Sequence, residues 1–218
     1  MEDFFGRDSS LSSDIQDQAH SIMGKNFFGI DEAFHYFGIR PSKEELIHLA
    51  EIPWNEKVLK SCRDTHILVA AFPISILDIR DKAGRELYRE FENTWYSRKC
   101  AEVFVNKKGE ASWQLIRKTP VVGSTDKSWL EQQKLLGSDE ETPTARILFY
   151  TIIGHFLVTG ERLFENVSVW CSDLDSSGYC SRFGWYSTGP IVDTAWHTYE
   201  AVRGPGMGLS SVRIKRER

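Results

Sequence analysis

The sequence is poor in the residue spacings that usually mark metal and redox sites. Its cysteines, Cys62, Cys100, Cys171 and Cys180, include no CxxC pair, and its six histidines include no HxH or HxxxH spacing. Zinc sites are commonly formed by such closely spaced ligands. We therefore expect no metal and no cofactor. In a reducing compartment, the four thiols are expected to be buried or incidental.

Several other signals are missing. There is no nucleophile elbow, P-loop or dinucleotide-binding fingerprint, so no enzyme class is indicated. The 27 Lys and Arg are mixed with 31 Asp and Glu, so no basic face for nucleic acid is expected. No apolar run reaches the length of a membrane span, and the start MEDFFGRDSS lacks the regions of a signal peptide. We expect a non-enzymatic protein that neither binds nucleic acid nor spans a membrane, and that is cytoplasmic unless it is exported by a route that its sequence does not announce.

The beginning of the chain is rich in helix signals. Residues 31–37 carry aromatic rings at helical spacing, Ser42 begins a capping-box pattern, and Asn55 is placed to cap a further helix. A length of 218 residues suits one sizeable domain with a small extension. We predict an N-terminal helical appendage over residues 1–63 and a main domain over residues 64–218.

The main domain begins with HILVAAFPISILDI, an apolar run typical of a buried strand and interrupted by Pro73. The run predicts a strand at 67–72 and a second strand or a turn of helix at 74–79. Further along, a helix is expected at 86–95, a hairpin joining 103–105 to 112–117, and a helix at 129–136.

The clearest helix is predicted over residues 144–159. It is apolar almost all round, follows an acidic stretch at 139–141 near its positive end, and is followed by Gly160. It should therefore be the buried central helix. Strands are expected after it at 167–170, 183–187, 191–194 and 210–214. The fold class predicted is α+β, with helices flanking short antiparallel strands.

The segment from Glu165 to Arg213 has an unusual composition. Tryptophan and tyrosine alternate with Ser, Gly, Asp, Thr and Cys, while the segment has only two leucines and no lysine. Rings with few torsions give large contact area at low entropic cost, and small polar groups give adaptable hydrogen bonds. This composition is typical of a recognition surface. The alternative is a run of antiparallel strands whose rings form the core.

The order of these segments resembles a family of largely uncharacterised proteins from uncultivated, small-genome microbes and their mobile elements. The resemblance rests on WQLIRKTPVVGSTDKSWLEQQKLL, DEETPTARILFYTIIGHFLVTGERLFENVSV, CSDLDSSG and the ending GLSSVR. It covers most of the chain from about residue 44 to residue 213.

The constant body, the buried helix and the aromatic C-terminal segment also resemble the variable proteins of diversity-generating retroelements. That resemblance implies a C-type-lectin fold of the formylglycine-generating-enzyme subtype. It further implies a hypervariable region at about 166–213 that binds a protein or other macromolecular ligand. The chain lacks the RLPTEAEW-like stretch of those proteins.

The resemblance also implies roles for individual residues. Adenine-directed diversification of AAC-type codons yields Tyr, Ser, Phe, Cys, His and similar residues, but never Trp. The tryptophans of the segment should therefore form the scaffold of the site: Trp170, Trp185 and Trp196. The ligand-binding set would be Tyr179, Cys180, Ser181, Phe183, Tyr186, Ser187, His197, Thr198 and Tyr199.

Two alternative functions stay open. A copper-dependent oxidase of the formylglycine-generating type would need a reactive cysteine pair, for which Cys171 and Cys180 are the candidates. A structural protein of a mobile element is the other. The acids Asp173 and Asp175 lie among serines, and oxygen ligands at that spacing suit calcium. A turn stabilised by Asx and Ser side chains is the interpretation we favour.

Overall fold

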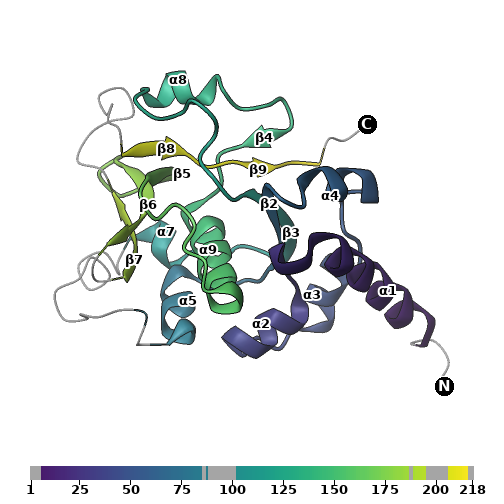
Figure 1. Ribbon diagram of the computed structural model, residues 1–218. Helices are drawn as coiled ribbons and strands as arrows, with labels where there is room; N and C mark the ends of the chain where they lie inside the picture. Colours follow the sequence, from purple (N-terminus) through teal and green to yellow (C-terminus); the bar gives the residue numbers. More distant parts are fainter. Residues whose placement is uncertain (1–5, 85–86, 88–101, 187–188, 195–205, 216–218) are drawn as a thin grey trace.

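The computed structural model describes residues 6–84, 87, 102–186, 189–194 and 206–215, with 6–13 and 186 described by their backbone alone. Two mixed sheets surround one central helix, α9 (Ala145–Thr159) (Figure 1). The fold class α+β is therefore confirmed. The first sheet has the order β1-β2-β3-β9-β4 and the second the order β7-β6-β5-β8.

The strands of the first sheet are β1 (Phe27–Phe28), β2 (His66–Ala71), β3 (Ser112–Arg117), β4 (Glu140–Glu141) and β9 (Val212–Arg213). Those of the second are β5 (Ser168–Leu174), β6 (Cys180–Tyr186), β7 (Gly189–Thr194) and β8 (Met207–Leu209). The other helices are α1 (Gly6–Met23), α2 (Ile30–Phe37), α3 (Lys43–His48), α4 (Glu56–Cys62), α5 (Ile76–Ala83), α7 (Val103–Asn106) and α8 (Trp129–Gln133). A 3-10 turn spans Gly24–Asn26.

Two helix starts predicted from capping residues are confirmed, whereas α2 begins at Ile30 with Gly29 as its N-cap, before the predicted start at Asp31. The Oγ of Ser42 accepts the backbone N–H of Glu45, whose carboxylate accepts the N–H of Ser42 in return. Asn55 accepts the N–H of Val58 at the start of α4. Each contact satisfies a backbone donor that a helix end leaves without an intrahelical partner.

The first 63 residues share the core of the rest of the chain. Strand β1 pairs in parallel with β2, and the ring of Phe28 packs edge-on against Tyr150 of α9, with 5.7 Å between centroids. Close approach here depends on Gly154, because a Cβ at that position would lie 2.9 Å from the Phe28 ring. The N-terminal helices therefore complete the hydrophobic cluster around α9.

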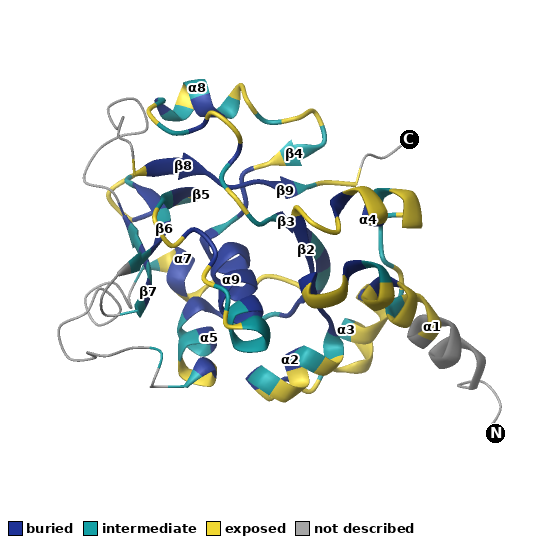
Figure 2. Ribbon diagram, viewed as in Figure 1, coloured by how far each residue is buried: buried dark blue, intermediate teal, exposed yellow. Residues whose placement is uncertain are grey.

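The region between β2 and α8 differs in part from its prediction. The strand expected at 67–72 is β2, in which all six residues are buried (Figure 2). The segment at 74–79 forms the start of helix α5, which Ser75 caps. The hairpin strand expected at 103–105 is wrong, because α7 is a helical turn that buries the consecutive residues Phe104 and Val105.

The helix expected at 86–95 lies outside the described residues. The one expected at 129–136 is shorter, since α8 ends at Gln133. Gln132 is fully buried there, and its side-chain amide donates to the backbone carbonyls of Ser124 and Met207 at 2.7 and 3.2 Å. This contact holds the α8 region against β8.

Helix α9 matches its prediction. Thr144 caps it, Gly160 ends it in the left-handed conformation (φ 73°), and its first eleven residues are all buried. The carboxylate that accepts its first N–H, however, comes from Asp173 in β5. Two acids of the preceding stretch instead face arginines of the first sheet: Glu140 pairs with Arg117, and Asp139 with Arg213.

The C-terminal segment forms an antiparallel meander and then crosses between the sheets. Strands β5, β6 and β7 are antiparallel neighbours, whereas β8 runs parallel to β5. The strand predicted at 210–214 is shortened to β9 of the first sheet. It is preceded by β8 of the second sheet, and Ser210 and Ser211 are fully buried between the two strands. The chain end thus joins the two sheets.

Candidate functional site

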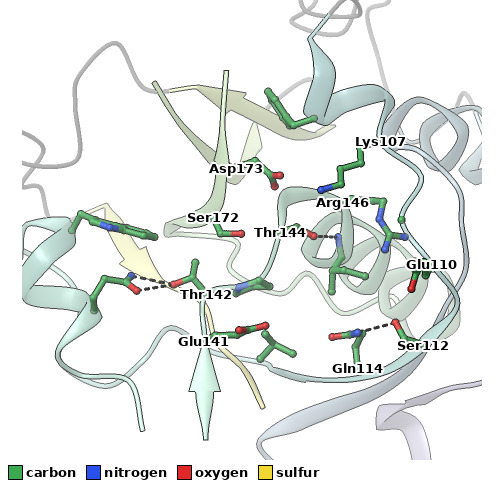
Figure 3. A pocket seen from close by; sticks show the side chains of 17 residues that line it. Lys107, Glu110, Ser112, Gln114, Glu141, Thr142, Thr144, Arg146, Ser172 and Asp173 are labelled. Atoms are coloured by element: carbon green, nitrogen blue, oxygen red, sulfur yellow. Dashed lines mark hydrogen bonds between the residues drawn. The ribbon is translucent and has the colours of Figure 1, made fainter. Parts of the chain in front are cut away.

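A pocket of about 680 Å³ opens where the first turn of α9 meets β5 (Figure 3). Its other walls include the loop between α7 and β3, the loop between α8 and α9, and residues of β3, α8 and β9. Ligand pockets in proteins have volumes of about 300–1,000 Å³. The pocket therefore has the size needed for a small organic ligand.

Arg146, in the first turn of α9, is the most buried charged group of the pocket, with 8% of its surface exposed. Its Nη1 donates to the carbonyl of Phe72 at 2.8 Å. Burial lowers the pKa of the Arg146 guanidinium, because removal from water disfavours the charged form. Within the described part of the chain, no carboxylate comes within ion-pair distance of this guanidinium.

Asp173 lies across the pocket from Arg146 and Lys107 (Figure 3). One of its carboxylate oxygens accepts the backbone N–H of Ala145 at 2.6 Å, at the positive end of α9. Burial raises the pKa of Asp173, while this hydrogen bond and the charges of Lys107 and Arg146 oppose the shift. The carboxylate therefore stabilises the helix start at a cost in desolvation.

The remaining walls mix apolar side chains, among them Phe104, Trp129 and Ile147, with polar ones. The side-chain amide of Gln133 and the hydroxyl of Thr142 exchange hydrogen bonds of 3.0 and 3.3 Å, and Gln114 donates to Ser112 at 2.9 Å. The exposed carboxylates Glu110 and Glu141 lie in the lining as well. Donors, acceptors and charges of both signs thus surround one cavity, an arrangement suited to a polar ligand.

The structure does not bring the two candidate copper thiols together. Cys171 packs with Val169 and Phe183 in the cluster around α9, whereas Cys180 packs with Trp170 in a separate cluster. Because neighbouring strand residues point to opposite faces, these clusters lie on the two sides of the second sheet. Among the described residues, no group of three or more His, Cys, Asp or Glu is placed to hold a metal ion.

Of the two acids, Asp175 forms the turn that we favoured, whereas Asp173 lies within β5. The carboxylate of Asp175 accepts the backbone N–H groups of Ser177 and Tyr179, both at 2.9 Å. Ser176 in turn donates from its N–H and its hydroxyl to Glu102, just before α7. The turn between β5 and β6 is therefore fastened to the element that precedes the pocket loop.

The structure describes the side chains of only some residues in the predicted ligand-binding set. The expectation that Cys180, Ser181 and Phe183 face outward is wrong, because each has 0% exposure. Tyr179 is half-buried at the turn. The others lie outside what the structure describes: the side chain of Tyr186, and Ser187, His197, Thr198 and Tyr199.

Strand β6 is buried because both of its faces are covered. On one face, Phe183 packs against Phe149 of α9 at 6.2 Å between ring centroids. On the other face, Cys180 belongs to a buried cluster with Val121 and Leu209. The composition of the segment could not reveal this second cover, because part of it, Val121, comes from outside the segment.

Two of the predicted scaffold tryptophans are packed inside, and the third, Trp196, lies outside the described residues. Trp170 is fully buried, with its ring edge-on to that of Trp129. Trp185 is half-buried beside Phe156, and its indole N–H donates to the carbonyl of Leu163 at 2.6 Å. Their role as the support of a binding site stays a prediction.

The pocket residues were missed by reasoning from the sequence. One signal was present: Arg146 is the single Lys, Arg, Asp or Glu in ARILFYTIIGHFLVT, the otherwise apolar sequence of α9. A charged side chain on a helix buried all round needs a partner or a polar cavity. Asp173 and the loop after α7 could not be placed near it without the fold.

In the described part of the chain, no helix has both the length and the apolar character that crossing a bilayer requires. Comparison of the chain with protein-family models, with curated proteins and with solved structures found no match in any of the three.

Proposed function

We propose that this protein is a non-enzymatic binding protein that takes a polar ligand into the pocket at the start of α9. The observation that carries the proposal is a buried guanidinium, that of Arg146, lining a cavity of about 680 Å³ without a carboxylate partner among the described residues. A buried charge without a counter-charge is costly, and it is retained where it serves binding.

The proposal includes the C-terminal segment as part of the binding region. Ser172 and Asp173, near the start of the predicted variable region 166–213, form one wall of the pocket. Glu102 fastens the following turn to the region of the pocket loop. Substitutions at residues 172–177 of this segment would therefore alter the pocket or its surroundings while α9 and the first sheet keep their sequences.

Blocking the pocket tests the binding function. Ser172→Trp places a large ring at an exposed position of the lining, and Ser177→Trp places the same ring on an exposed turn outside it. A fragment library screened by ligand-observed NMR should contain binders to the wild type and to Ser177→Trp that Ser172→Trp loses. Equal binding to the two variants, or no binder to the wild type, would refute the proposed site.

Diversification of the segment is a separate proposal with a genomic test. The coding sequence of residues 166–213 should have a near-identical repeat that differs mainly at adenines, beside a reverse-transcriptase gene. A complete locus with neither feature would remove the retroelement proposal and leave the pocket untouched.

A further inference from the structure

We infer that the pocket binds a small zwitterion of the amino-acid type, with its carboxylate held by Arg146. This inference rests on the proposed binding function and specifies the chemical class of its ligand. Three features of the lining carry it: the uncommitted N–H groups of Arg146, the space beside them at Gly109, and the balance of charges around the cavity.

Most N–H donors of the Arg146 guanidinium have no acceptor among the described residues. Of its five N–H bonds, the structure commits one nitrogen, Nη1, to the carbonyl of Phe72, and Arg146 forms no other hydrogen bond with the described residues. A guanidinium edge presents two parallel N–H donors that match the two oxygens of a carboxylate. Such a ligand would satisfy both the charge and the donors of this buried group.

Gly109 keeps the space beside that edge open. A Cβ at position 109 would clash with Nη2 and the central carbon of Arg146 and would lie 2.9 Å from its Nε. Gly109 also has φ +69°, a conformation that side chains rarely adopt. The loop between α7 and β3 therefore packs closely beside Arg146 with no side chain at position 109 against the guanidinium, and Gly109 itself lines the pocket.

The surrounding charges select the ligand class. Two cations, Lys107 and Arg146, face three acids, Asp173, Glu110 and Glu141. A doubly charged phosphate would meet net repulsion in this lining. A ligand with one carboxylate and one ammonium group instead finds a cation for the first and exposed carboxylates for the second.

The test is calorimetric titration of the wild-type chain with each proteinogenic L-amino acid, its methyl ester and inorganic phosphate at neutral pH. We expect at least one amino acid to bind. Its methyl ester, which lacks the carboxylate charge, should bind about tenfold or more weakly. Arg146→Gln should lose the binding, whereas Arg162→Gln, an exposed arginine outside the pocket, should keep it.

A second pair of variants guards against misfolding of Arg146→Gln. Gly109→Ala and Gly123→Ala strain the backbone alike, with φ of +69° and +72°, but only the first places a Cβ against Arg146. We expect Gly109→Ala to weaken amino-acid binding by about tenfold or more relative to Gly123→Ala. Equal affinities in this pair would contradict the role of Arg146.

The outcomes separate this inference from the binding function. If no amino acid binds, if esters bind as tightly, or if phosphate binds more tightly, the inference is overturned. If neutral polar fragments bind, are lost in Ser172→Trp and are kept in Arg146→Gln, the proposed binding site stands without it. A dipeptide that binds more tightly than any free amino acid, and needs Arg146, supports the carboxylate site and assigns it to a peptide end.

Discussion

The two sheets around α9 differ in how well the amino-acid sequence of a strand predicts whether its side chains are buried. In the first sheet, β2 is an unbroken apolar run, and all six of its residues are buried. In the second sheet, β6 has the Cys, Ser, Arg, Phe and Gly composition of a recognition surface, yet Cys180 and Phe183 are fully buried. Aromatic and serine-rich composition therefore does not distinguish a displayed surface from a strand covered on both sides.

The largest expected effect on stability comes from removing a buried side chain of β6. Phe183→Ala removes a ring packed against α9 and should lower the free energy of unfolding by about 3–5 kcal/mol. Tyr179→Ala, at the half-buried turn of the same segment, should cost about 1 kcal/mol or less. Urea denaturation of both variants measures the difference. Similar small losses for both would restore the surface interpretation of β6.

The first sheet offers the next largest effect through His66 of β2. Burial, reinforced by the charges of Arg117 and Arg213, lowers the pKa of His66 from 6.5 to about 4. As the pH falls, His66 therefore becomes protonated near pH 6.5 in the unfolded chain, but only near pH 4 in the native state. Native stability should fall over that window by about 3 kcal/mol from this group alone.

His66→Gln isolates this contribution. The carboxylates and His155 titrate in both proteins, so the difference between their unfolding free energies reports the histidine. We expect that difference to shift in favour of the variant as the pH is lowered from 6.5 to 4. Parallel stability curves over this range would show that His66 is not shielded as the structure places it.

The smallest effect concerns Asp173, where the second sheet meets α9. Asp173→Ala removes the acceptor of the Ala145 N–H and should destabilise the protein by about 1 kcal/mol. Asp173→Asn keeps an acceptor and removes the buried charge. Because the pKa of Asp173 is raised, its ionised form is disfavoured in the native state. Asp173→Asn should therefore gain stability over the wild type as the pH rises through that pKa.

Thermal unfolding of the two Asp173 variants at several pH values checks this prediction. If alanine and asparagine behave alike at every pH, the hydrogen bond to Ala145 contributes nothing. If the wild type instead gains on Asp173→Asn with rising pH, the carboxylate is stabilised by its charge partners more than burial penalises it.

The elements that could be predicted are those determined by local chemistry. Ser42 and Asn55 begin their helices through contacts three residues away, and Gly160 ends α9 through its own backbone conformation. Helix α7 was predicted as a strand because its short apolar sequence suits a strand and a helical turn alike.

The candidate site could not be predicted because its walls come from four separate parts of the chain. Arg146 and Asp173 are 27 positions apart, and only the packing of β5 beside the start of α9 brings the carboxylate to the N–H of Ala145. Likewise, the end of the chain forms β8 at the edge of the second sheet and then β9 between β3 and β4 of the first. This change of sheet depends on how distant strands are arranged. Neither arrangement has a local signature.

The central claim is that a polar ligand binds at the start of α9. An amide-detected NMR titration with a compound found to bind the wild type tests it most directly. We expect the shifted amides to gather around Ala145, Arg146 and Ser172, with Tyr179 changed less. Shifts gathered away from the pocket, with Ala145 and Arg146 unmoved, would contradict it.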